Sequence, residues 1–178
     1  MPFIEIKDDD LKRLRELAGI FEIKDVVTKV LDDFLEDYTK PKPSSSNEEV
    51  KVFDFSNLPS LAHAKFISGT FAGVAANSPA WNTLLAQAIE VAAPRLGGIH
   101  KIATVSGINI VKGEKTDEGY KHIRSLAASF HGVSAIYAAR YIGDLGKAIN
   151  ESVEIEFRWR NKDEAAHPGV AGRLIHNP

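Results

Sequence analysis

Apolar and charged side chains alternate most regularly near the end of the chain, over residues 153–160, VEIEFRWR. A period of two predicts a half-buried strand with a charged outer face. Residues 161–169, NKDEAAHPG, predict a loop, and residues 170–175 predict a final strand that pairs back on the first. Trp159 belongs to the apolar face of this strand, so we expect it in the core.

A helical pattern of apolar residues covers residues 81–92. Ser78 is a suitable N-cap for this helix, and Pro79 fits the first helical position because its missing N–H is not needed there. We expect Pro94 and Gly97–Gly98 to end the helix.

Two further segments also predict helices. Ser134 begins a helix that continues to residue 151 and presents one apolar face. Small and apolar residues dominate 58–76, where Gly69 and Gly73 would let a helix pack closely, so we expect a third helix there.

The remaining pattern is more fragmented. Residues 50–55 and 107–113 predict short strands, residues 113–121 predict a polar loop, and residues 125–133 fit a strand or a short helix equally well. Residues 50–178 therefore predict one domain of the α/β class, or α+β, with about three helices and a small antiparallel sheet at its end.

The opening of the chain predicts a separate module. Residues 3–7 alternate as a short strand, and Asp8–Asp10 then supply an N-cap and favourable charge for a helix that Gly19 ends. Residues 26–38 form the stronger amphipathic helix. A strand followed by two short helices cannot bury a core alone, so we expect a second copy to complete it.

This stretch resembles the ribbon–helix–helix superfamily, and within it the amino-terminal oligomerisation domain of the sequestration protein SeqA. The resemblance covers about a fifth of the chain and implies an intertwined dimer whose two strands pair. The residues expected at the dimer interface are Ile4, Ile6, Val26, Val27, Val30, Leu31 and Phe34. Glu22 stands where superfamily members often place Ser or Thr, so phosphate binding by that helix end is not implied.

Two functions are open for the module. In many ribbon–helix–helix repressors the outward side chains of the paired strands enter the major groove. Here Glu5 would face the DNA, where phosphates repel a carboxylate. Residues 1–40 also hold seven Lys and Arg against eleven Asp and Glu, a balance of −4. These charges favour dimerisation without DNA contact over DNA recognition by the strands.

Residues 39–49, TKPKPSSSNEE, contain no apolar residue and predict a flexible linker. The chain therefore has a two-domain plan: a dimerisation module at 1–38, the linker, and an α/β domain at 50–178. A dimeric module on a tether presents two copies of the second domain to a shared target.

Composition adds a few limits. The 178 residues include no cysteine, which removes disulfides and thiolate metal sites, and no apolar run approaches the roughly 20 residues of a membrane span. We expect a cytoplasmic protein without membrane contact and without a cofactor. Residues 60–178 carry a balance of +3 and all six histidines, so the second domain differs in charge from the first.

No phosphate-loop, dinucleotide-binding or common hydrolase motif is present. Glu154 and Glu156 on the last long strand suggest a Mg²⁺-dependent nuclease, but the position where such enzymes place a lysine holds Arg158, which cannot act as a base. The histidines lie in separate segments without metal-ligand spacing. We therefore expect no catalytic residues and no metal site.

The basic residues of the second domain form two groups, one in and beside the polar loop and one on the last strands. They are Lys112, Lys115, Lys121 and Arg124, and Arg158, Arg160, Lys162 and Arg173. If the two groups converge, they form a surface that tracks phosphates. Scattered solubilising charges are the alternative interpretation.

The leading hypothesis is a dimeric, DNA-associated regulator of prokaryotic type that contacts nucleic acid through its second domain. A protein-interaction adaptor is the main alternative, in which the helices at 58–76 and at Trp81 present a partner groove. A Mg²⁺-dependent nuclease is the third.

Overall fold

The structure is a computed structural model, and it describes residues 50–117 and 119–178. The predicted ribbon–helix–helix module at 1–38, its seven interface residues and the linker at 39–49 lie outside the described residues and stay predictions.

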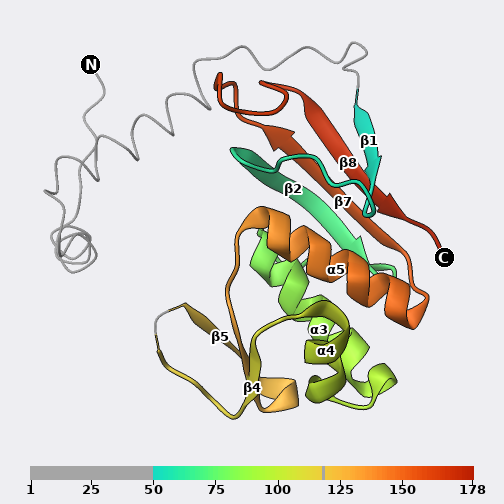
Figure 1. The fold of residues 1–178 in the computed structure, drawn as a ribbon, viewed down its shortest axis with the longest axis vertical. Coiled ribbons are helices and arrows are strands. Elements are labelled where there is room, and N and C mark those ends of the chain that lie inside the picture. Colours follow the sequence, from blue (N-terminus) through green and yellow to red (C-terminus); the bar gives the residue numbers. More distant parts are fainter. Residues whose placement is uncertain (1–49, 118) are drawn as a thin grey trace, which may run out of the picture. The chain divides into compact units, whose positions relative to one another are not determined.

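The described residues form a mixed α/β fold with two sheets and three helices, as the sequence predicted in outline (Figure 1). The large sheet has the order β1-β8-β7-β2-β3. Its strands are β1 (Lys51–Asp54), β2 (Ala64–Phe71), β3 (Val74–Ala75), β7 (Val153–Trp159) and β8 (Ala171–His176). The small sheet has the order β4-β6-β5. Its strands are β4 (Ile110–Lys112), β5 (Tyr120–Ile123) and β6 (Ala128–His131).

The helices separate the two sheets (Figure 1). They are α3 (Trp81–Leu96), α4 (Ile99–Ser106) and α5 (Ala135–Ile149), with a 3₁₀ turn, η1 (Arg124–Leu126), before β6. None of the helices in the part that the structure describes has the length and apolar character needed to cross a membrane.

Strand β7 lies at the centre of the large sheet and confirms the alternation of residues 153–159. Its apolar residues are all at most 1% exposed, while the intervening charged residues are partly exposed. Strands β8 and β2 pair with it in antiparallel fashion, so the predicted final strand is also confirmed. The predicted entry strand is β1, which pairs with β8 in parallel, a pairing that the sequence pattern does not contain.

The prediction of a helix over 58–76 is wrong, because this segment contains strands β2 and β3. Ala72 and Gly73 make the turn between them with φ of 51° and 76°, the positive values that a two-residue type I′ hairpin turn requires. Gly69 lies where a Cβ would come within 2.7 Å of the Leu84 side chain. The small residues thus let a strand, not a helix, approach α3 closely.

Helix α3 confirms the prediction for 81–92 but begins differently, because Ala80, not Ser78, occupies the N-cap. Pro94 stands inside the last turn, while the predicted end at Gly97 is confirmed. The helix ends at Gly97, whose left-handed φ of 88° lets its N–H reach the carbonyl of Ala93.

Helix α5 begins directly after Ser134, the predicted start, and ends at Asn150, which is in the left-handed conformation. Residues 125–133, whose pattern fitted a strand or a short helix equally well, form the end of η1 followed by strand β6. Residues 99–106 form α4. The predicted polar loop at 113–121 runs into β5, which starts at Tyr120.

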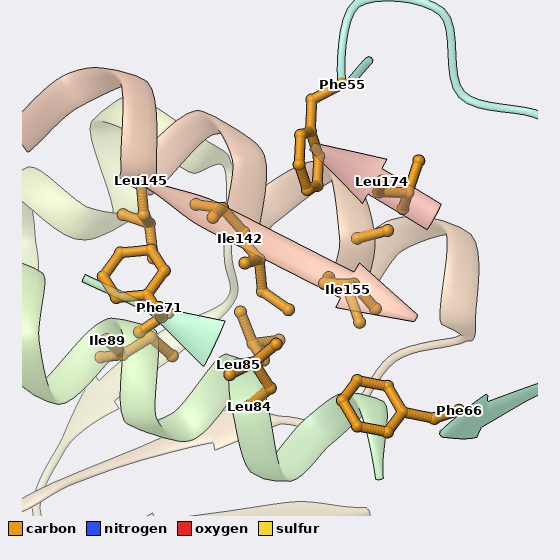
Figure 2. Packing of buried hydrophobic residues seen from close by; sticks show 14 of the residues in the cluster. Phe55, Phe66, Phe71, Leu84, Leu85, Ile89, Ile142, Leu145, Ile155 and Leu174 are labelled. Atoms are coloured by element: carbon orange, nitrogen blue, oxygen red, sulfur yellow. The ribbon is translucent and has the colours of Figure 1, made fainter. Parts of the chain in front are cut away.

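One apolar core lies between the large sheet and the helices (Figure 2). Phe66 and Phe71 of β2 and Ile155 of β7 meet the helical residues there. Leu84 and Leu85 come from α3, and Ile142 and Leu145 come from α5; all four are fully buried. The core therefore fixes the start of α3 against β2, which places the site described next.

Candidate nucleic-acid interface

The eight basic residues expected to contact nucleic acid occupy several different places. Lys112 and Lys121 lie on strands β4 and β5 of the small sheet, Lys115 lies in the loop between them, and Arg124 lies in η1. Arg158 lies on β7, Arg160 and Lys162 follow at its exit, and Arg173 lies on β8. Lys112 and Lys121 are two register positions apart on the small sheet and line different grooves.

Arg173 is held by acidic neighbours on the face of the large sheet that points away from the helices. Its Nε lies 3.2 Å from Oε1 of Glu154, and its Nη2 donates to Oε1 of Glu156. Ser68 donates to the other Glu156 oxygen at 3.0 Å. The Arg173 guanidinium, with help from Ser68, therefore holds the pKa of Glu156 below its usual value. One guanidinium and two carboxylates meet here, so this end of the outer face carries no excess positive charge.

This ion pair also bears on the nuclease hypothesis. Glu156 already uses both carboxylate oxygens in hydrogen bonds, one to Arg173 and one to Ser68. Among residues 50–117 and 119–178 there is no group of three or more His, Asp or Glu side chains placed to hold a metal ion. The charged strand thus gives no specific support for Mg²⁺ chemistry.

The other end of the same face is positive. Lys65 of β2 lies directly opposite Arg158 of β7. Arg160 follows at the strand exit, where its backbone N–H donates to the carbonyl of His63 at 2.9 Å. Lys65, Arg158 and Arg160 therefore bring three basic side chains to this end of the face.

A groove opens beside Lys65, and we call it the cationic groove. It has a volume of about 570 Å³ and brings together β2, the start of α3, strand β5 and the segment that leads into α5. Its lining consists of Ala64, Lys65, Phe66, Ile67, Pro79, Ala80, Trp81, Asn82, Thr83, Lys121, Val133 and Ala135. Two of these described residues are lysines and none is acidic.

The backbone adds to the positive potential of the cationic groove. Helix α3 starts in it with Ala80 as N-cap, and α5 starts at Ala135 on its rim. Neither helix has a side-chain cap or an acidic residue in its first turn. The N-terminal N–H groups and the helix dipoles therefore face this region without a neutralising carboxylate.

Asn82 holds the two helix starts together. Its Nδ2 donates to the carbonyl of Val133 at 2.9 Å, and its Oδ1 accepts from the backbone N–H of Val133 at 3.0 Å. This pair of bonds links the first turn of α3 to the segment that precedes α5. The wall of the groove is therefore fixed before any ligand arrives.

Apolar side chains form the rest of the lining. The Trp81 and Phe66 rings meet edge to face with centroids 5.2 Å apart. Trp81 Nε1 is out of contact with solvent and has no hydrogen-bond partner. Ile67 is 46% exposed, at the β-bulge that interrupts the pairing of β2 with β7. Bulges commonly re-aim a side chain next to a functional site.

A second groove, of about 820 Å³, lies at the other end of α3 and differs in charge. Lys112 and His100 line it together with Glu90, whose carboxylate accepts a hydrogen bond from Ser125. A carboxylate in the lining repels an anion. Lys112 therefore provides a matched basic residue away from the cationic groove.

The outer face of the small sheet carries a Ser–His pair that resembles a nucleophile and its base. Ser129 is fully buried, and it donates its one proton to the carbonyl of Gly113 at 2.9 Å. It also accepts from the Lys115 backbone N–H at 3.0 Å, and His122 Nδ1 lies 3.2 Å away. Because the hydroxyl proton points to a carbonyl and not to the imidazole, the pair anchors a loop and gives no activated nucleophile.

Lys115 of that loop interacts with its own neighbours. Its ammonium lies 3.1 Å from Asp117 and 3.9 Å from the centre of the Tyr120 ring. The hydrogen bond to Asp117 raises the pKa of Lys115 above its usual value. Of the loop group, only Lys121 lies in the cationic groove.

Comparison of the chain with protein-family models, with curated proteins and with solved structures gave no match.

Sequence reasoning missed Lys65, because it fell in the segment expected to be a helix. It also missed the two helix starts, whose proximity depends on the fold. The alternation of Lys65 with Phe66 and of Ile67 with Ser68 is too short to separate a strand from a helix.

Proposed function

We propose that this chain is a dimeric, DNA-associated regulatory protein that contacts nucleic acid through the cationic groove and the adjoining positive end of the large sheet. The proposal rests on the lining of the cationic groove, where Lys65 of the large sheet and Lys121 of the small sheet come together. Two helices without a side-chain cap start beside them, and none of the described lining residues is acidic. Lys65 also continues into Arg158 across the strand pair. Such a surface offers positive charge and backbone donors to phosphate groups.

The dimeric part of the proposal rests on the strand–helix–helix pattern of residues 3–38. A dimer would present two cationic grooves to one nucleic acid and so raise the overall affinity by effective concentration. The solution mass of the full chain, measured by light scattering, tests this part.

The adaptor hypothesis loses its main support, since it relied on a helix at 58–76 beside the helix at Trp81. Strand β2 occupies that position. No separate observation favours an adaptor, so it serves as an outcome of the test below.

The test is salt-dependent binding of the full chain to labelled single-stranded and duplex DNA and RNA, measured by fluorescence anisotropy. We expect binding at low salt that weakens steeply as salt rises, because phosphate contacts release counterions. Lys65→Ala and Lys121→Ala should each weaken binding and reduce the slope of log K against log salt by about one.

Lys112→Ala is the matched control, because it removes the same charge from the second groove. It should leave affinity and slope close to those of the unmodified chain. The absence of measurable affinity for every nucleic acid at low salt would reject the proposal. An equal effect of all three substitutions would reject the groove as the site and leave general charge as the cause.

A further inference from the structure

We infer that Asn82 is a positioning residue that holds Lys121 of the small sheet in the groove that Lys65 of the large sheet also lines. This inference rests on the proposed function and deepens it, because it accounts for the way two lysines from separate sheets act on one ligand. Lys65 is placed by its own sheet, where it pairs with Arg158 of β7. The ammonium group of Lys121 has no hydrogen bond or ion pair with any other residue that the structure describes, so its position depends on what holds strand β5.

The link begins at the first turn of α3. Asn82 Nδ2 donates to the Val133 carbonyl at 2.9 Å, and Asn82 Oδ1 accepts from the Val133 backbone N–H at 3.0 Å. Two bonds to one residue fix the direction of that segment as well as its distance from α3. Each polar atom of Asn82 thus has a backbone partner, which suits a residue that holds the groove rather than one that binds its ligand.

The link continues from this segment to β5. The N–H of Gly132 donates to the carbonyl of Gly119 at 2.8 Å, directly before β5 begins. Lys121 is the second residue of β5. The start of this strand is therefore bonded to the segment that Asn82 holds, and a shift of the segment would move Lys121 with it.

The side chain of Lys121 also lies against this segment. A Cβ atom placed on Gly132 would come within 3.4 Å of Lys121 Cε and 3.8 Å of Asn82 Oδ1. The end of the lysine side chain and the Asn82 amide are therefore neighbours of the same glycine, whose missing side chain leaves room for the lysine. Both the backbone and the side chain of Lys121 thus depend on the segment that Asn82 holds.

Loss of the link should change binding without any change in charge. Without Asn82, the segment at Val133 is no longer bonded to α3, and the ligand itself then has to order Lys121. Ordering a long side chain and its backbone costs conformational entropy, which reduces the binding free energy. With Asn82 present, this ordering is completed when the chain folds.

The experiment measures the affinity of the full chain for labelled oligothymidine, oligouridine and a mixed-sequence DNA duplex over a series of salt concentrations. Asn82→Ala should weaken binding nearly as much as Lys121→Ala and lower the slope of log K against log salt by about one, although it removes no charge. In the Lys121→Ala background, Asn82→Ala should cause less than about a twofold further loss, because the contact that it supports is already absent. In the Lys65→Ala background it should keep its full effect.

Gln87→Ala is the matched control. Gln87 is also an α3 residue whose side-chain amide donates to a backbone carbonyl, that of Val74 at 3.0 Å, but it does not line the groove. This variant should lose some stability in thermal melting and bind the probes like the unmodified chain. If Asn82→Ala melts below the assay temperature, Gly132→Val replaces it, since this change keeps Asn82 and fills the space beside Lys121; it should give the same loss of affinity and slope.

The outcomes separate this inference from the proposed function. If Lys65→Ala and Lys121→Ala weaken binding while Asn82→Ala does not, the inference is overturned and nucleic-acid binding stands. An Asn82→Ala loss that is undiminished in the Lys121→Ala background, or one that Gln87→Ala reproduces, also overturns it, because Asn82 would then act directly or through general stability. Failure of the unmodified chain to bind any probe at low salt overturns both.

Discussion

The two sheets of this domain are held in different ways. The large sheet buries an unbroken apolar face, in which Phe157 and Trp159 of its central strand are at most 1% exposed. The central strand of the small sheet also places Phe130 in the core, but its other face buries a serine, Ser129, whose hydroxyl anchors the loop that precedes β5. The large sheet therefore depends on apolar area and packing, whereas the outer face of the small sheet depends on a few hydrogen bonds that must all be satisfied.

The two sheets should therefore be sensitive to different kinds of substitution. Loss of volume should damage the large sheet and, through the shared core, the whole domain. Loss of one hydroxyl should damage the small sheet locally and leave the rest of the fold in place.

The largest expected effect is that of Trp159→Ala in the large sheet. The indole is fully buried, contacts Phe157 with ring centroids 4.7 Å apart, and donates from Nε1 to the Ser60 carbonyl at 2.8 Å. Removing it leaves a cavity and an unpaired carbonyl, so the free energy of unfolding should fall by about 3–5 kcal/mol. Chemical denaturation followed by circular dichroism measures the loss.

Trp159→Phe is the control for volume, since it keeps an aromatic ring and removes the hydrogen bond to Ser60. It should lose clearly less stability than Trp159→Ala. Equal losses in the two variants would mean that the hydrogen bond, and not the packing, dominates at this position.

A smaller and more local effect is expected for Ser129→Ala in the small sheet. The change leaves the Gly113 carbonyl and the Lys115 N–H without their partner in a buried place, which should cost about 1–3 kcal/mol. Amide hydrogen exchange should increase in the 113–117 loop and in β5 while β7 stays protected. Faster exchange throughout β7 would contradict the independence of the two sheets.

Ser125→Ala gives the matched control for that experiment. Its exposed hydroxyl donates to Glu90 near the same sheet, so its removal should change stability by no more than about 0.5 kcal/mol.

The elements that could be predicted from the sequence are those whose own side chains decide their structure. Strand β7 alternates over its whole length, and α5 presents one apolar face after Ser134, so both were predicted with nearly correct limits. Strand β2 was mistaken for a helix because the role of Gly69 depends on Leu84, a residue of another element. The parallel pairing of β1 with β8 is likewise a property of the fold and not of either segment.

The candidate site shows the same limit. The eight basic residues were chosen by their nearness in sequence, yet the cationic groove includes only Lys121 of that set. Its second lysine, Lys65, lies on the misassigned strand. The helix starts that complete it meet only through the bonds of Asn82 to Val133, two residues 51 positions apart. The local sequence pattern around either helix start does not indicate that the two starts lie side by side.

The smallest expected effect distinguishes the two faces of the large sheet. The buried face should make the same contribution to the free energy of unfolding at all pH values. The outer face contains Glu156, whose pKa is lowered by Arg173 and Ser68. A carboxyl whose pKa is lower in the folded state stabilises the fold fully above its unfolded pKa of about 4.3, and this contribution is lost as pH falls through the folded pKa. Because both side chains are about 40% exposed, the pair should contribute about 0–1 kcal/mol.

Glu156→Gln should therefore be less stable than the unmodified chain at neutral pH, and the difference should shrink toward zero as the solution is acidified below about pH 4. Urea denaturation across that range measures it. Glu164→Gln, which removes an exposed carboxylate from the 161–169 loop, controls for the loss of one charge. A difference that stays constant or grows on acidification would show that Glu156 acts through packing, like the buried face, and that charge does not set the outer face apart.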